Sequence, residues 1–255
     1  TVTGFRVWHG EDMASVRSQI SWIAVAEALA LATSEPHGDA PLRVLDVGGG
    51  AGVDAVRVAR EGHQVTVVDQ SSDALAALQR RAFEANVDVV AIQADGEAVD
   101  SEMFTEPFDV VLCHGVLESA PNPTALLQAI VSALKHGGVL SVQVPSLNAA
   151  MKHHVSLGEE STALRLFNAE IGSWNLDEFG PRRYSWDEAG QLVTSAGLSL
   201  IGVRGVRVFG DSAQPDVTDG DNERFGTLLE LEQRLRVRPE FAGGSGGLQA
   251  LGRLD

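Results

Sequence analysis

The segment from Val44 to Ser71, with the sequence VLDVGGGAGVDAVRVAREGHQVTVVDQS, constrains the fold more than any other part of the chain. A short apolar run leads into four glycines within five residues, a helix-like stretch follows, and a second apolar run ends at Asp69. Glycines between a strand and a helix let the backbone turn sharply and let a ligand approach closely, because no Cβ is in the way. The segment therefore predicts a strand, a ligand-binding glycine loop, a helix and a second strand.

The spacing of the glycines distinguishes between ligand classes. A dinucleotide fingerprint, G-x-G-x-x-G, needs its third glycine at position 53, but the chain has Val53 there and places the glycine one residue earlier, at Gly52. A phosphate-binding P-loop is excluded because no Gly-Lys-Ser/Thr follows, and the only lysines are Lys135 and Lys152. A glycine-rich turn that holds no ligand is the remaining structural alternative.

The length and composition of the chain indicate how many domains it forms and in which cellular compartment it is expected. A chain of 255 residues that is 44% hydrophobic is long enough for one large domain, and we expect a single domain over residues 1–255. The single cysteine, Cys113, excludes an internal disulfide. No apolar run is long enough to span a bilayer, and Glu11, Asp12 and Arg17 occupy the segment where a signal peptide would be apolar. We therefore expect a cytoplasmic protein.

The net charge of −16 predicts repulsion from nucleic acid and from anionic membranes. The arginines nevertheless cluster in the C-terminal part of the chain. The clusters are Arg182 and Arg183, Arg204 and Arg207, and Arg234, Arg236 and Arg238. Surface ion pairs on solvated helices account for such clusters as readily as a binding site does.

Apolar β-branched runs alternate with helical patterns, which is typical of an α/β fold with a mostly parallel sheet and helices on both faces. Seven strands are expected, at 43–47, 64–69, 87–93, 108–114, 139–144, 198–209 (a bent strand or strand pair) and 248–254. Helices are expected at 52–61, 73–85, 123–134, 185–196 and 225–237, with a polar loop at 211–222. The mixed composition of residues 145–183 predicts an irregular lid inserted at the carboxyl edge of the sheet.

Two features beside the glycine loop indicate a nucleoside. Asp69 ends the second strand, where a carboxylate can accept hydrogen bonds from both hydroxyls of a ribose. The alternative role for Asp69 is an N-cap, but Ser71 and Ser72 are better placed to cap the next helix. With Asp46 inside the first strand the loop becomes D-V-G-G-G-A-G, which resembles the nucleotide loop of class I methyltransferases that use S-adenosylmethionine.

This resemblance implies the Rossmann-like class I methyltransferase fold and a division of the domain into four parts. These are an N-terminal helical cap (1–40), a half that binds S-adenosylmethionine (41–144), the lid insertion (145–183) and C-terminal helices and strands (184–255). Asp95, after the third strand in IQADGEA, matches the acidic residue that meets the adenine amino group in this superfamily.

Four further segments narrow the family: FDVVLCHGVLESAPNP, ALKHGGVLSV, GVRVFGD and LLELEQRLRVRPEF. Together they resemble the CmoM/SmtA family, whose members methylate carboxymethoxyuridine at the tRNA wobble position. Carried over by position, the resemblance implies cofactor contacts at Arg17, Gly48, Gly49, Asp69, Asp95, Gly96 and His114. We further expect contacts at Asp46, Gly50, Gly52 and Gln70.

The catalytic residues are expected to be His114 and Arg207. An ionised carboxylate acceptor needs no general base, but it needs a cation to position it, and Arg207 within GVRVF is the best candidate, with Arg183 and Tyr184 as helpers. Glu118 is either a base or a surface carboxylate at a helix start. The adjacent histidines at 153 and 154 lack a third ligand at metal-binding spacing, so no metal is expected.

The sequence leaves two acceptors as alternatives: a carboxylate in tRNA and a small molecule. The charge disfavours tRNA, because residues 146–181 contain only Lys152 and Arg165 as basic groups. A protein that binds S-adenosylmethionine without catalysis is a third hypothesis, disfavoured by the joint presence of Arg17, Asp69, Asp95 and His114.

Overall fold

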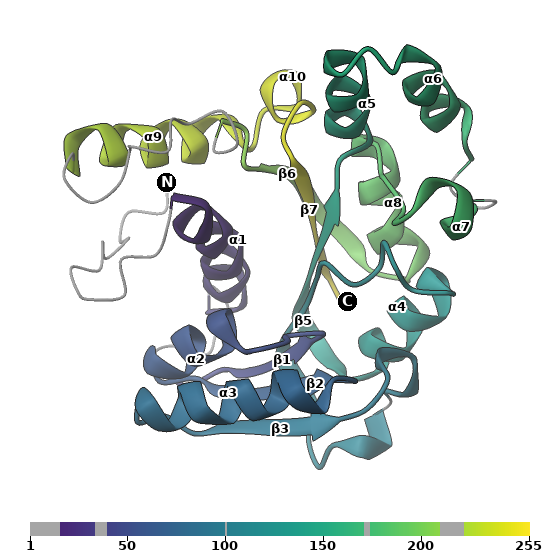
Figure 1. The fold of residues 1–255 in the computed structure, drawn as a ribbon. Coiled ribbons are helices and arrows are strands. Elements are labelled where there is room, and N and C mark those ends of the chain that lie inside the picture. The colour runs from purple at the N-terminus through teal and green to yellow at the C-terminus, as the bar shows by residue number, and fades with distance from the viewer. Residues whose placement is uncertain (1–15, 34–39, 100, 171–173, 210–221) are drawn as a thin grey trace.

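The computed structural model describes residues 16–33, 40–99, 101–170, 174–209 and 222–255, and its centre is a seven-stranded sheet in the order β3-β2-β1-β4-β5-β7-β6 (Figure 1). The strands are β1 Arg43–Val47, β2 Gln64–Asp69, β3 Val89–Gln93, β4 Phe108–His114, β5 Leu134–Pro145, β6 Ser199–Val206 and β7 Gly247–Arg253. Strands β1 to β5 pair in parallel, whereas β7 lies antiparallel between β5 and β6. The expected fold class is confirmed.

Helices cover both faces of the sheet, because successive side chains of the buried strands point to opposite sides (Figure 1). One face packs against α1 Val16–Thr33, α2 Val53–Arg60 and α3 Ser72–Glu84, and the other against α4 Pro123–Ser132 and α8 Trp186–Ser195. On β4, for example, Leu112 lies in the first core and Val111 in the second. The chain ends with α9 Asn222–Leu235, α10 Pro239–Ala242 and β7.

Polar residues begin several of these helices as the sequence predicts. The Ser71 hydroxyl accepts a hydrogen bond from Ala74 N at the start of α3, so the prediction that a serine and not Asp69 caps this helix is confirmed. Asn122 caps α4 in the same way, and Ser185 forms a capping box with Glu188 at α8. These caps fix where each strand-to-helix loop turns.

The direction of the strands determines which loops meet. Because β7 is antiparallel to both of its neighbours, β6 points the same way as β1 to β5. The carboxyl ends of these six strands therefore share one edge of the sheet. The glycine loop follows β1 at this edge, and Arg207 follows β6.

Two expectations are corrected, and one alternative is decided. The described part of residues 145–183 is not irregular, because it forms α5 Leu147–Ser156, α6 Glu160–Asn168 and α7 Leu176–Phe179, of which α5 begins at the cap Ser146. Of the two forms expected for 198–209, the structure has one strand, β6, over Ser199–Val206, with a register shift between Leu200 and Gly202. Strand β5 begins at Leu134, directly after α4, instead of at residue 139. The predicted polar loop lies, except for its last residue, outside the described residues.

None of the helices in the described ranges is long and apolar enough to cross a membrane. Two short 3₁₀ helices, η1 Gly96–Ala98 and η2 Ser101–Met103, connect β3 to β4. Whether the α5–α7 segment closes over the edge of the sheet stays a prediction.

The glycines that flank α2 provide a test of how tightly the glycine loop packs. Gly52 and Gly62 both have left-handed backbones, with φ of 69° and 92°. A Cβ on Gly52 would lie 2.0 Å from Leu78 Cδ1, whereas a Cβ on Gly62 meets nothing within 4 Å. We expect Gly52→Ala to lower the free energy of unfolding by about 1–3 kcal/mol more than Gly62→Ala, because only the first substitution adds a clash to the backbone strain. Urea unfolding of both variants measures the difference, and equal losses would contradict the close packing of Leu78.

Candidate functional site

The glycine loop is pressed against its neighbours and open on one side. A Cβ on Gly48 would lie 2.3 Å from Val116 Cγ2, in the loop after β4, and a Cβ on Gly49 would lie 2.4 Å from Asp46 Oδ2. At Gly50 the nearest atom to an added Cβ is a backbone oxygen at 4.0 Å. The left-handed residues of the loop are Gly48, Gly50 and Gly52. The loop thus forms a cradle in which backbone atoms can contact a ligand directly.

Asp69 is held in a fixed orientation by the loop. Its Oδ2 accepts a hydrogen bond from Gly50 N at 2.9 Å, and its Oδ1 accepts one from Ser71 N at 2.8 Å. The carboxylate is half-buried, and each oxygen keeps a further lone pair. Asp69 can therefore accept two hydroxyl groups in the fork geometry that a ribose requires. Gln70 beside it is exposed.

Asp95 and Gly96 lie next to Asp69, at the end of the neighbouring strand β3. The two strand ends are joined by the hydrogen bond from Ala94 N to Asp69 O, at 3.2 Å. Asp95 is exposed, and its Oδ1 accepts a hydrogen bond from Glu97 N at 2.9 Å. A Cβ on Gly96 would lie 2.8 Å from Leu126 Cδ1, so this turn also packs closely. Asp95 is thus oriented at the same edge as Asp69.

Asp46 is buried beneath the loop, only 6% exposed. Burial, together with the negative charges of Asp54 and Asp69, raises the pKa of Asp46 to about 7. The negative charges of Asp54 and Asp69 close to one loop favour a cationic ligand and disfavour a pyrophosphate. This electrostatic preference agrees with the glycine spacing, which also argues against a dinucleotide.

His114 lies at the end of β4 with both ring nitrogens engaged. The Gln143 amide donates to Nδ1 at 3.2 Å, and Nε2 lies 2.8 Å from Ser141 Oγ. Burial lowers the pKa of His114 to about 3, so the imidazole is neutral. A neutral ring with two partners is suited to forming a wall of the site or orienting a ligand, and poorly suited to general base catalysis.

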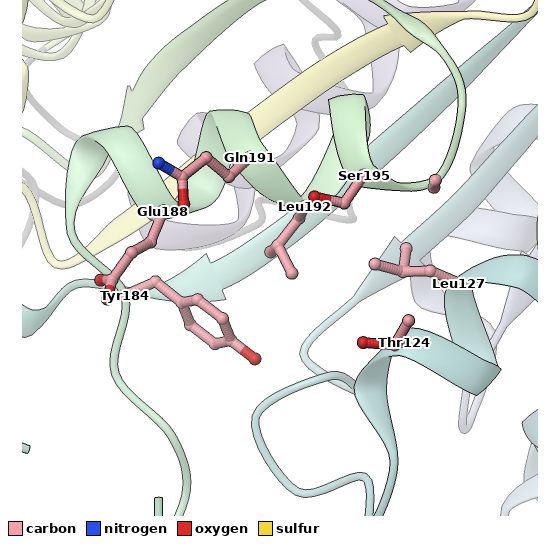
Figure 2. A pocket seen from close by; sticks show the side chains of 8 residues that line it. Thr124, Leu127, Tyr184, Glu188, Gln191, Leu192 and Ser195 are labelled. Atoms are coloured by element: carbon pink, nitrogen blue, oxygen red, sulfur yellow. The ribbon is translucent and has the colours of Figure 1, made fainter. Parts of the chain in front are cut away.

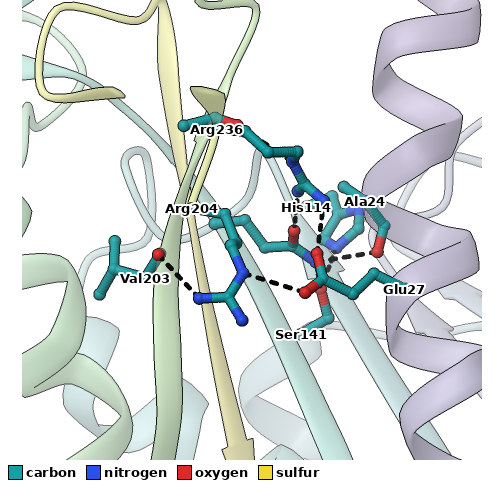
Figure 3. Close-up of polar contacts among 9 residues, drawn as sticks. Ala24, Glu27, His114, Ser141, Val203, Arg204 and Arg236 are labelled. Carbon is teal, nitrogen blue, oxygen red and sulfur yellow. Dashed lines mark hydrogen bonds and ion pairs between the residues drawn. The ribbon is translucent and has the colours of Figure 1, made fainter. Parts of the chain in front are cut away.

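A buried polar network continues from His114 across the sheet (Figure 3). Ser141 Oγ also accepts a hydrogen bond from Gln249 Nε2 at 2.8 Å, and Gln249 Oε1 accepts one from the Arg236 guanidinium. Glu27 of α1 pairs with Arg236 and with Arg204 of β6, the latter at 2.9 Å. Sequence reasoning missed this network. A signal was present, because polar residues interrupt the apolar strands in LSVQV and LQALG.

The loop after β4 brings Glu118 toward the segment before α8. Glu118 is half-buried, its Oε2 is buried without a hydrogen-bond partner among the described residues, and burial raises its pKa. Arg183 lies close enough to lower that pKa again through its charge. Arg182, in contrast, is buried, and its guanidinium donates to Ala120 O and Pro121 O. Arg182 therefore fixes the loop and is not available to an external phosphate.

Tyr184 is only 1% exposed, and its side chain lies in the core between α4 and α8. Figure 2 shows its ring pointing into a cavity of about 170 Å³, toward Thr124 and beside Leu192. Its hydroxyl has no hydrogen-bond partner in the described part of the chain. The expected place of Tyr184, on the lid, is corrected to the core beside α8, whereas its expected role as a helper for the acceptor stays a prediction.

The remaining candidates are placed as follows. Arg17 belongs to the first turn of α1, but its side chain lies outside the described residues. Arg207 directly follows β6 with φ of 59°, an unusual left-handed conformation for an arginine, and its carbonyl accepts a hydrogen bond from Gly246 N. His154 pairs with Glu159. No group of three metal-ligating side chains occurs in the described ranges.

Burial of Asp46 makes the stability of the free protein depend on pH. The folded state holds this proton up to about pH 7, whereas the unfolded chain releases it near the ordinary pKa of 3.8. Raising the pH across this window therefore destabilises the folded state. We expect the free energy of unfolding to fall more steeply with pH in the parent than in Asp46→Asn, which does not titrate.

Urea unfolding at about pH 5 and about pH 8 measures this dependence. Asp73→Asn, at an exposed carboxylate of α3, is the control and should keep the parent's behaviour. An identical pH dependence in the parent and in Asp46→Asn would contradict a buried, protonated Asp46.

Comparison with known proteins agrees with this geometry. Residues 39–197 match the family model described as "Methyltransferase domain". The tRNA 5-carboxymethoxyuridine methyltransferase of Escherichia coli (strain K12) is 30% identical over 231 residues, which are 89% of this chain and 83% of that protein. The ubiquinone biosynthesis O-methyltransferase of Serratia proteamaculans (strain 568) is 40% identical over 97 residues, which are 37% of this chain and 39% of that protein.

Solved structures show the same fold. The CcbJ methyltransferase from Streptomyces caelestis superposes with a TM-score of 0.59 and 16% identity, covering 98% of this chain and 100% of that one. The magnesium protoporphyrin IX methyltransferase from Synechocystis PCC 6803, with bound SAH, gives a TM-score of 0.56 at 13% identity and covers 94% and 82% of the two chains. With the glycine cradle, the oriented Asp69 and the seven-stranded sheet, these matches show that the chain belongs to the class I S-adenosylmethionine-dependent methyltransferases and resembles the tRNA 5-carboxymethoxyuridine enzymes along most of its length.

Proposed function

We propose that this methyltransferase transfers its methyl group to a carboxylate oxygen of an anionic acceptor, and that 5-carboxymethoxyuridine in tRNA is the favoured acceptor. The observation that carries the proposal is the extent of the similarity. The tRNA enzyme of Escherichia coli aligns with 89% of this chain, whereas the ubiquinone biosynthesis enzymes align with 37–44%. At 89% of the chain, the longer alignment necessarily takes in most of the residues after β5, including Arg207.

We further propose which residues hold the donor. Asp69 accepts the two ribose hydroxyls, Asp95 meets the adenine amino group, and the backbone of Gly48 to Gly50 lies against the methionine portion. The support is that Asp69 is already oriented by Gly50 N and Ser71 N, so little conformational freedom is lost when a ligand binds. Arg17, Asp46, Gly52, Gln70, Gly96 and His114 complete the proposed set.

S-adenosylmethionine supplies, when bound, a methyl group on a sulfonium that departs as a neutral thioether. An ionised carboxylate is nucleophilic without deprotonation, so the protein contributes orientation and exclusion of water. Arg207 lies three strands from β4, roughly 14 Å at the usual strand spacing. This separation suits a residue that holds the acceptor, beyond the reach of the donor bound over β1 and β4.

A small-molecule carboxylate is the second candidate, and two observations favour it. The chain has a net charge of −16, which opposes binding to a phosphate backbone. One arginine of the pair before α8, Arg182, is occupied by backbone carbonyls. Only Arg183 of that pair is therefore a candidate for phosphate contact.

Methyl transfer to tRNA that carries unmethylated 5-carboxymethoxyuridine, compared with a mixture of small carboxylates, distinguishes the two candidates. A tRNA acceptor should give transfer that falls steeply with salt, and Arg183→Gln should flatten that slope. Arg234→Gln, at an exposed surface arginine, is the control and should leave the slope unchanged. No transfer to this tRNA, together with transfer to a small carboxylate, would overturn the tRNA assignment.

The donor site is tested by removing the ribose acceptors. Asp69→Ala leaves both hydroxyls without partners, and we expect it to weaken S-adenosylmethionine binding by about 1–3 kcal/mol. Asp73→Ala, at an exposed carboxylate in the next helix, is the matched control and should bind like the parent. Isothermal calorimetry measures both affinities, and unchanged binding in Asp69→Ala would refute the assignment.

The acceptor site is tested at Arg207. We expect Arg207→Leu to lower methyl transfer at least about tenfold and to leave the affinity for S-adenosylmethionine unchanged, because the lost cation acts on the acceptor alone. Arg207→Lys should recover part of the activity, since it restores the charge without the planar fork. Steady-state kinetics with the identified acceptor provide the measurement. Full activity of the leucine variant would refute the role of Arg207 in holding the acceptor, but it would not contradict the proposed donor site.

A further inference from the structure

Gln249 is a fully buried polar residue in the middle of the apolar strand β7. Its amide uses both N–H donors and one acceptor position of the carbonyl oxygen. Nε2 donates to Ala24 O of α1 at 2.9 Å and to Ser141 Oγ of β5 at 2.8 Å, while Oε1 accepts from the Arg236 guanidinium. One side chain therefore joins three segments that are far apart in the sequence.

Through Ser141 this amide reaches the donor edge of the sheet. Ser141 Oγ lies 2.8 Å from His114 Nε2, at the carboxyl end of β4. His114 and α1 are thus held by the same buried amide, and Figure 3 shows His114 and Ser141 facing Ala24 and Glu27 of the helix. Interactions buried in this way are worth more than surface ones, because an unmade bond cannot be replaced by water.

The direction of α1 shows what this contact controls. Gln249 pairs with Gln143 near the carboxyl end of β5, whereas Arg253 pairs with Val139, four residues closer to the amino end of that strand. Gln249 holds Ala24 O, and Arg253 donates to Leu31 O at 3.0 Å. Helix α1 therefore runs away from the glycine loop, and its first turn, which contains Arg17, is at the donor edge.

We propose that Gln249 is a positioning residue for the methyl-donor site. Its amide sets the place of the first turn of α1 and of the His114 ring relative to the glycine loop, although Gln249 itself touches neither the donor nor the acceptor. Arg236 fixes the rotamer of the amide by occupying Oε1, so that both N–H groups face their acceptors. The inference rests on the proposed donor site, because both features that Gln249 positions, the first turn of α1 and the His114 ring, belong to that site.

The chain offers a matched control on the same strand. Gln249→Met and Arg253→Met each remove one tie between β7 and α1, at opposite edges of the sheet. We expect Gln249→Met to raise the dissociation constant for S-adenosylmethionine at least tenfold, to raise the donor KM more than it lowers kcat, and to move the NMR signals of the His114 ring. Arg253→Met should change stability but leave the dissociation constant within twofold of the parent.

A third variant, Ser141→Ala, covers the case in which Gln249→Met does not fold. It leaves the bonds from Gln249 to α1 and Arg236 intact and cuts the link to His114. We expect it to move the His114 signals and to raise the dissociation constant severalfold. Calorimetry with S-adenosylmethionine and NMR of the full chain labelled at histidine are the readouts.

The possible results distinguish a failure of the positioning role from a failure of the proposed donor site. A parent that binds S-adenosylmethionine, with Gln249→Met binding equally well, would overturn the positioning role alone. Equal losses of affinity in Gln249→Met and Arg253→Met would overturn it as well, because general loosening of α1 would then account for the effect. A parent that does not bind S-adenosylmethionine would overturn the donor site and this inference together.

Discussion

The close approach of the glycine loop to the loop after β4 is the constraint on which the site depends. Gly48 has no room for a Cβ against Val116, and Gly49 has none against Asp46. The contact between Gly48 and Val116 exists because β1 and β4 are neighbours in a parallel sheet, so that their carboxyl ends emerge side by side. The cradle, the oriented carboxylate of Asp69 and the acidic residue after β3 all lie at one edge of the sheet, because each follows one of several adjacent parallel strands.

The polar network around Gln249 concerns a different feature, the position of helix α1 on the sheet. Helix α1 packs on one face of the sheet through apolar contacts. Such contacts are not directional, so they determine which side of the helix faces the sheet better than they determine where the helix lies along it. Directional bonds from Gln249 to Ala24 O, and from Arg204 and Arg236 to Glu27, fix that position. Buried polar groups of this kind cost desolvation, and their benefit is a single defined geometry.

The strands, the glycine loop and the carboxylate Asp69 could be predicted from the sequence because local patterns determine them. Alternation of strands and helices dictates the parallel sheet, and the spacing of glycines distinguishes one ligand class from another. The α5–α7 segment was missed because it contributes little to the core: α5 has no buried side chain and α6 buries only Ala163 and Leu166. Its mixed polar and apolar composition therefore looks irregular. The Gln249 network was missed because a lone polar residue in a strand does not reveal its partners, which come from α1, β5 and the segment after α9.

The order of the strands gives the two substrates of the proposed reaction separate electrostatic environments. The carboxylates Asp69 and Asp95 lie at the ends of β2 and β3, on one side of β4, whereas Arg207 follows β6 on the other side. A cationic donor is attracted to the first group and an anionic acceptor to the second. Because the donor loses its positive charge when the methyl group leaves, its attraction to the carboxylates falls in the product, and the same happens to an acceptor whose carboxylate becomes an ester. The arrangement therefore favours binding of both substrates over retention of both products, which is the direction of turnover that the proposed reaction requires.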